Sequence, residues 1–225
     1  MPLIDINQLT EDLLHTGAAQ PTGVFAGPAT PPPLPGDPVQ ALRTRSAVRQ
    51  WASGPMEVGT LARVLQYACE QDDRIWKPAF PTLPTPTAAV LARRVGGLPD
   101  GYYHYDPGRE ALVRQAQPMP PAEELVLQLE FAQAPVLVLA LGDLAQATGR
   151  HGASGHRLLL ARGAALAHAM WLAALSRGAV GTVFAGVLNA AGRTELGIDG
   201  FHQAQLLGLA LGEPRSNEPP AREGR

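Results

Sequence analysis

The chain has 225 residues and a formal net charge of −2, and 45% of its side chains are hydrophobic while 17% are charged. This size suits one domain with a sizeable core, and the charge offers no general attraction for nucleic acid or an acidic membrane surface. The single cysteine excludes an intrachain disulfide or a Cys-x-x-Cys pair. Because the N-terminus lacks the basic start and apolar run of a signal peptide, we expect a cytoplasmic protein.

Proline and glycine crowd residues 20–38, which argues against a helix or a central strand there. We expect an extended arm that joins a short helix, near residues 5–16, to the folded domain. A disordered tail and an arm that wraps a partner subunit are both compatible with this composition. The sequence therefore divides into an arm at 1–38, a domain at 39–214 and a tail at 215–225.

Helical and extended patterns alternate through the domain, which predicts an α+β fold. The predicted helices cover 57–70, 121–133, 158–175 and a segment ending at 195, and the predicted strands cover 88–95, 102–105, 135–142, 182–184 and 205–211. The helix at 158–175 is apolar nearly all round, yet Arg162 and His168 interrupt it and no basic flank marks a membrane span. We expect it to be a central helix, enclosed by protein and lying at a dimer interface.

Two arginines and a serine lie within one turn at the start of the domain, in Arg45-Ser-Ala-Val-Arg49. Two guanidinium groups, a hydroxyl and the N–H groups of a helix start can hold a phosphate. A solvated surface cluster is the alternative. A second feature, at 97–106, combines a Gly-Leu-Pro-Asp-Gly turn with a Tyr-Tyr-His-Tyr strand and predicts a hairpin.

In this order and at this separation, the stretches 43–51 and 93–112 resemble the nitroreductase superfamily of flavin enzymes. They are most similar to its SagB-type dehydrogenase branch, whose members oxidise thiazoline and oxazoline rings in peptides. The stretches 178–187 and 195–199 are similar to the family's flavin-facing loop and the helix end that follows. The resemblance implies a central mixed or antiparallel sheet flanked by helices, in an obligate dimer with FMN at the subunit interface.

The resemblance also assigns roles to residues. The implied cofactor-binding residues are Arg45, Ser46, Arg49, Ala185, Gly186, Arg215 and Arg222. Arg45, Ser46 and one of the two C-terminal arginines would approach the phosphate, and Arg49 would lie near the flavin ring. Ala185 and Gly186 would present backbone N–H groups to flavin N5, which accepts hydride.

The chain departs from the family pattern at several positions. The loop at 81–86 contains no glycine, whereas SagB-type enzymes carry Pro-Ser-Gly-Gly before the strand. Arg150-His151 replaces the Lys-Tyr pair that abstracts a proton in azoline oxidases. Arginine is a poor base, so the candidate catalytic residues are His151 and, as a second choice, Tyr103.

We therefore expect an FMN-dependent oxidoreductase that acts on a peptide azoline, another small heterocycle, a quinone or a nitroaromatic. The alternative is a degenerate homologue that keeps the scaffold without flavin turnover, as the partner subunit of a complex. Both hypotheses imply a homodimer or a heterodimer with a related subunit, and neither involves nucleic acid or a membrane. The histidines lack the spacing of metal ligands, so no metal site is expected.

Overall fold

The computed structural model describes residues 23–26, 38–185 and 189–215. The strands are β1 (Gly23–Ala26), β2 (Met56–Glu57), β3 (Thr87–Ala92), β4 (Val95–Gly96), β5 (Gly101–Asp106), β6 (Ala111–Arg114), β7 (Val136–Gly142), β8 (Val180–Phe184) and β9 (Ala204–Gly212). The helices are α2 (Pro38–Thr44), α3 (Val58–Ala79), α4 (Ala122–Leu125), the 3₁₀ helix η1 (Leu129–Gln133), α5 (Leu144–His151), α6 (Ala153–Leu175) and α7 (Asn189–Leu196). This mixture confirms the α+β class.

Seven strands form one sheet in the order β1-β6-β5-β3-β7-β9-β8, and every neighbouring pair in it is antiparallel. The central strand β7 is buried along its whole length, as its unbroken apolar sequence predicts. β2 and β4 form a separate two-stranded parallel ladder. The strand β1 comes from the proline-rich arm and pairs with β6 at one edge of the sheet, so this part of the arm extends the chain's own sheet.

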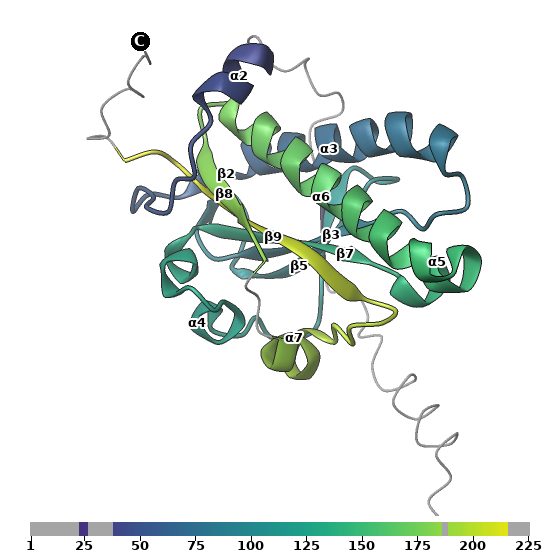
Figure 1. Cartoon of the computed structure of the whole chain (residues 1–225). Helices are drawn as coiled ribbons and strands as arrows, with labels where there is room; N and C mark the ends of the chain where they lie inside the picture. Colours follow the sequence, from purple (N-terminus) through teal and green to yellow (C-terminus); the bar gives the residue numbers. More distant parts are fainter. Residues whose placement is uncertain (1–22, 27–37, 186–188, 216–225) are drawn as a thin grey trace, which may run out of the picture.

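Two hydrophobic clusters lie on opposite faces of the sheet, because successive strand side chains point to opposite sides. On one face, Val90 and Val138 pack with the long helices α3 and α6. On the other face, Leu91 and Leu139 pack with α4, η1 and the end of α7. Figure 1 shows α3 and α6 above the sheet and α4 and α7 below it. The sheet is thus the middle layer of a three-layer domain.

Two helices differ from their predicted bounds. The helix predicted at 57–70 runs to Ala79 and takes Pro78 into its last turn. The helix predicted at 121–133 is two short elements, α4 and η1, because Val126 between them is extended and only 1% exposed. Val126 is buried in the cluster that contains Leu91 and Leu139, which we call the lower cluster, and this burial takes precedence over a continuous helix.

The helix α6 is the apolar helix that the sequence predicts, but the single chain does not enclose it all round. It packs on α3 and on the sheet through residues such as Leu166 and Met170, while Leu160 and Ala164 are exposed. It is also the one helix in the described ranges that is long and apolar enough to cross a membrane. Half of its most apolar 18-residue stretch is buried in protein. The core helices of soluble proteins can have the same length and composition.

Candidate functional site

The segment that carries the arginine cluster runs along the edge strand β8. The backbone N–H of Val48 donates to the carbonyl of Gly181 (3.2 Å), and the indole N–H of Trp51 donates to the carbonyl of Val180 (3.3 Å). Val48 and Trp51 are buried, whereas Arg45 and Arg49 are exposed. The apolar residues therefore fix the segment to the sheet and leave its charged side chains free to meet a ligand.

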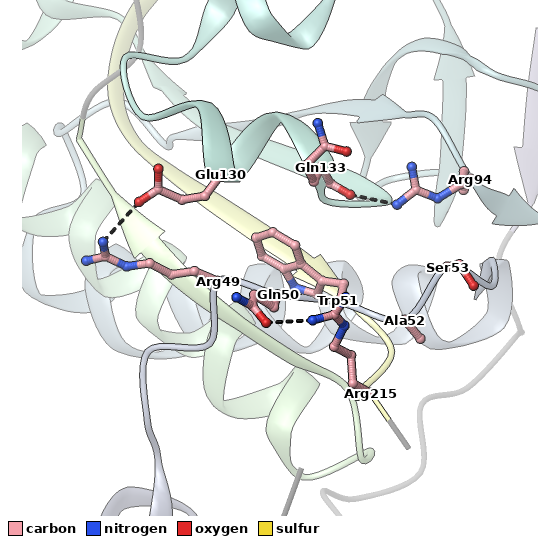
Figure 2. A pocket seen from close by; sticks show the side chains of 9 residues that line it. All are labelled: Arg49, Gln50, Trp51, Ala52, Ser53, Arg94, Glu130, Gln133 and Arg215. Carbon is pink, nitrogen blue, oxygen red and sulfur yellow. Dashed lines mark hydrogen bonds and ion pairs between the residues drawn. The ribbon is translucent and has the colours of Figure 1, made fainter. Parts of the chain in front are cut away.

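Arg49 opens onto a hollow of about 980 Å³, which we call the arginine hollow (Figure 2). The hollow is lined by Arg49, Gln50, Trp51, Ala52, Ser53, Arg94, Glu130, Gln133 and Arg215. Its three arginines come from the segment beside β8, from the connection between β3 and β4, and from the residues after β9. One carboxylate faces them, so the lining carries a net positive charge suited to an anion.

Arg49 is held loosely in this hollow. Its guanidinium lies 3.1 Å from the Glu130 carboxylate, but both side chains are about half exposed, so solvent screens the pair. The guanidinium also lies 5.7 Å from the ring centre of Phe131, which stacks on Phe184 at 4.4 Å. Because Phe184 ends β8, Arg49 is placed beside an aromatic pair at the start of the predicted flavin-facing loop.

The other two arginines are fixed by neutral partners. Arg215 donates to the side-chain oxygen of Gln50 (2.6 Å), and Arg94 donates to the backbone carbonyl of Gln133 (2.6 Å). The Nε of Arg94 is buried without a hydrogen-bond partner in the described chain. Neither guanidinium is neutralised by a carboxylate in the hollow, so both can still interact with an anionic group.

Arg45 lies elsewhere, against helix α6. Its guanidinium lies 5.6 Å from the ring centre of Trp171, and it helps, after burial, to lower the pKa of His168. Ser46 is exposed and does not line the arginine hollow. The predicted phosphate residues Arg45 and Ser46 thus approach a different part of the molecule from Arg49.

The remaining predicted cofactor residues lie near the ends of described ranges. Ala185 follows β8 and is exposed. Arg215 lines the arginine hollow with Arg49, as the resemblance implies for two residues of one site. Gly186 and Arg222 lie outside the described residues.

The two candidate proton acceptors do not line this hollow. His151 ends helix α5, where its Nε2 lies 3.2 Å from the Thr82 hydroxyl. Tyr103 is fully buried in β5, its hydroxyl donates to the carbonyl of Pro99 (2.6 Å), and burial raises its pKa. A buried, hydrogen-bonded phenol is poorly placed to take a proton from a substrate. The catalytic roles of both residues stay predictions.

A buried ion pair fixes the proline loop that departs from the family pattern. Arg162 of α6 is 0% exposed and grips Asp72 of α3 at 3.0 Å through Nε and 2.6 Å through Nη2. Arg162 also donates to the carbonyl of Leu83 (2.8 Å) and to the hydroxyl of Thr85 (3.1 Å). Sequence reasoning treated Arg162 only as an interruption. A lone charge in an apolar helix is itself a signal, because buried charges are almost always paired.

Cys69 has no sign of a reactive thiol. Burial, followed by the charge of Asp72, raises its pKa to about 12. The described residues also hold no group of three His, Cys, Asp or Glu side chains that could bind a metal ion.

Comparison with protein families matches residues 42–213 to the nitroreductase family. No curated protein matches the chain. Among solved structures, a nitroreductase-like protein of Anabaena variabilis has a TM-score of 0.66 and 21% identity over 80% of this chain. This chain spans only 38% of that one.

Two further structures are relevant to the site. A nitroreductase-like protein of Desulfovibrio desulfuricans, in complex with FMN, has a TM-score of 0.56 and 16% identity over 84% of this chain and 92% of its own. A chain of the microcin synthetase McbBCD complex of E. coli, with truncated pro-MccB17 bound, has a TM-score of 0.59 and 13% identity over 96% of this chain and 84% of its own. At these identities the likeness shows the fold alone.

Proposed function

Because the chain belongs to the nitroreductase family, we propose that it is an oxidoreductase that binds FMN at the arginine hollow. The observation that carries the proposal is the convergence of Arg49, Arg94 and Arg215 on one hollow with a single, solvent-screened carboxylate. An FMN phosphate needs such donors, and the buried, unpartnered Nε of Arg94 is one that a bound anion can satisfy. The residues present thus suit the cofactor.

The proposed roles are those that the family resemblance assigns to these positions. Bound FMN supplies hydride transfer. Arg215, with Arg222 beyond the described residues, would neutralise the phosphate. The resemblance assigns Arg45 and Ser46 to the same phosphate, although neither lines the arginine hollow in this chain. Arg49 places a fixed positive charge near the ring, which its weak pairing with Glu130 leaves available. We assign the backbone N–H groups of Ala185 and of Gly186, which lies beyond the described residues, to the ring edge of bound FMN.

The proposed substrate is a peptide azoline, with another small heterocycle, a quinone or a nitroaromatic as further candidates. We assign the proton-accepting role to His151, because histidine is the side chain that most often serves as a general base, with Tyr103 as the second candidate. We further propose a cytoplasmic dimer in which the exposed face of α6, including Leu160, meets a second copy or a related subunit.

A second candidate function is a partner subunit without flavin turnover. It is favoured by the loop at 81–86, which has no glycine and is tied down by Arg162. The match to a chain of the E. coli microcin synthetase complex is compatible with membership of a multi-subunit assembly.

Anaerobic mixing of the FMN-loaded protein with an azoline-containing peptide separates the two candidates. An enzyme that oxidises the ring would bleach the visible flavin band in proportion to the azole formed, as measured by mass spectrometry. A subunit without turnover would leave both the band and the peptide mass unchanged. The same peptide with its azoline already oxidised is the matched control, and it should bleach nothing.

A further inference from the structure

Two arginines meet where helix α3 begins and helix α6 ends. Arg63 lies in the second turn of α3, and Arg177 lies two residues after the end of α6. The turn around Arg177 is fixed, because its N–H donates to the carbonyl of Ala174 (3.0 Å) and Gly178 has a positive φ of 81°. Neither arginine lines the arginine hollow.

Both side chains carry donors that have no partner among the residues that the structure describes. The Nε and Nη2 atoms of Arg177 and the Nε of Arg63 are buried from solvent and donate a hydrogen bond to no described residue. Buried donors without a partner are uncommon and costly. The two like charges also oppose each other: burial, and then the charge of Arg63, lower the pKa of Arg177.

Arg162 shows what such a guanidinium edge holds elsewhere in the same protein. Its Nε and Nη2, the same two atoms that are unpartnered in Arg177, grip the carboxylate of Asp72 at 3.0 and 2.6 Å. Across the described part of the chain, no carboxylate forms an ion pair with Arg63 or Arg177. The missing partner therefore has the geometry and charge of an oxyanion.

We propose that Arg63 and Arg177 form a binding site for a phosphate or carboxylate group, separate from the arginine hollow. The planar edge of Arg177 takes two oxygens of the group, and Arg63 turns from a repelling neighbour into a second ligand. Because two cations face the site, a doubly charged phosphate is favoured over a single carboxylate. Both residues are partly exposed, although the unpartnered atoms themselves are covered, so the guanidinium groups must turn to admit the anion.

The test is the unfolding temperature of the full chain in inorganic phosphate, against sodium chloride of the same ionic strength. Phosphate at roughly one hundred times its dissociation constant should raise the unfolding temperature by about 5 °C or more. Because the arginine hollow can also take phosphate, the response is compared in chains that already carry Arg215→Gln, where adding Arg177→Gln should abolish it. In chloride alone the same variant should be no less stable than the parent, because it removes a like-charge contact. A purely structural arginine would instead lower stability in both salts.

Control variants locate the response. Arg74→Gln changes an exposed arginine on the same helix, which bonds to Gln71, and should keep the full response. Arg215→Gln alone removes one arginine of the hollow and should keep the part of the response that belongs to Arg63 and Arg177. Acetate in place of phosphate tests whether a single carboxylate suffices. The proposal is overturned if the response of the Arg215→Gln chain survives the addition of Arg63→Gln or of Arg177→Gln, or if Arg215→Gln alone abolishes the response. FMN retention by Arg177→Gln reports separately on the proposed function.

Discussion

Replacing Arg162 by methionine should be one of the most damaging single substitutions in the domain. Arg162 and Asp72 are 0% and 2% exposed at their side chains, so the change leaves a carboxylate uncompensated in the interior. Breaking a buried pair in this way costs about 3–5 kcal/mol. Loss of the bonds to the Leu83 carbonyl and the Thr85 hydroxyl adds about 1 kcal/mol.

The expected loss of unfolding free energy is therefore about 4–6 kcal/mol, a large part of the stability of a typical domain. For a chain of this size the unfolding temperature should fall by about 8–24 °C. Urea unfolding followed by circular dichroism measures the free energy, and differential scanning calorimetry measures the temperature. The matched control is Lys77→Met, which removes an exposed ion pair with Asp73 on helix α3 and should change stability by less than about 1 kcal/mol.

The double variant Arg162→Met with Asp72→Leu separates the charge from the packing. Because it removes both charges together, it should recover most of the stability lost in Arg162→Met. A single variant that loses less than about 1 kcal/mol would refute the reasoning. A double variant that is less stable than Arg162→Met would refute it as well, because the loss would then come from shape and not from an orphaned carboxylate.

Three further predictions concern the site and the titratable groups. Arg49→Ala should lose bound FMN while the protein stays folded, whereas Arg109→Ala, which removes an exposed ion pair with Asp106 at 3.6 Å, should retain FMN. Gel filtration with absorbance detection measures both variants, and stoichiometric FMN in Arg49→Ala would contradict the assignment. Burial lowers the pKa of His104 in the folded protein, so below about pH 6.5 the unfolded chain binds more protons than the folded one. The free energy of unfolding should therefore fall from about pH 7 to pH 5. His104→Gln should flatten this slope in urea titrations, and an unchanged slope would place the effect elsewhere. Cys69, with its pKa raised to about 12, should react with iodoacetamide far more slowly in the folded than in the unfolded protein at pH 8, and equal rates by mass spectrometry would show that the thiol is not protected.

The local elements that sequence reasoning predicted well are those whose own residues dictate the geometry. The run at 135–142 is apolar at nearly every position and forms the central strand β7. The turn at 97–101 contains Gly97 with a positive φ of 83°, which suits glycine, and leads into β5 as predicted. In both cases the signal lies within ten residues.

Elements decided by tertiary contacts were predicted less well. The helix expected at 121–133 is interrupted because Val126 is needed in the lower cluster, and nothing in the local pattern indicates this. Helix α5 was not predicted, although Asp143 caps it by accepting from the N–H of Gln146 (2.7 Å). Its eight residues are too short and too weakly periodic to stand out.

The candidate site shows the same division. Sequence reasoning named Arg49 and Arg215, which the fold brings to one hollow although 165 residues separate Arg215 from its partner Gln50. It missed Arg94 and Glu130, because their place in the hollow comes from the pairing of β3 with β7 and not from any motif. The partner that Arg162 needs was likewise invisible, since Asp72 is 90 residues away.

The most direct test of the central claim is the visible absorbance spectrum of the purified full chain after incubation with FMN and gel filtration. The proposed oxidoreductase should carry a flavin band with about one FMN per chain, and Arg215→Gln should reduce it. A colourless protein that does not retain FMN at any concentration tested would contradict the claim and make the subunit without turnover the better account of this chain.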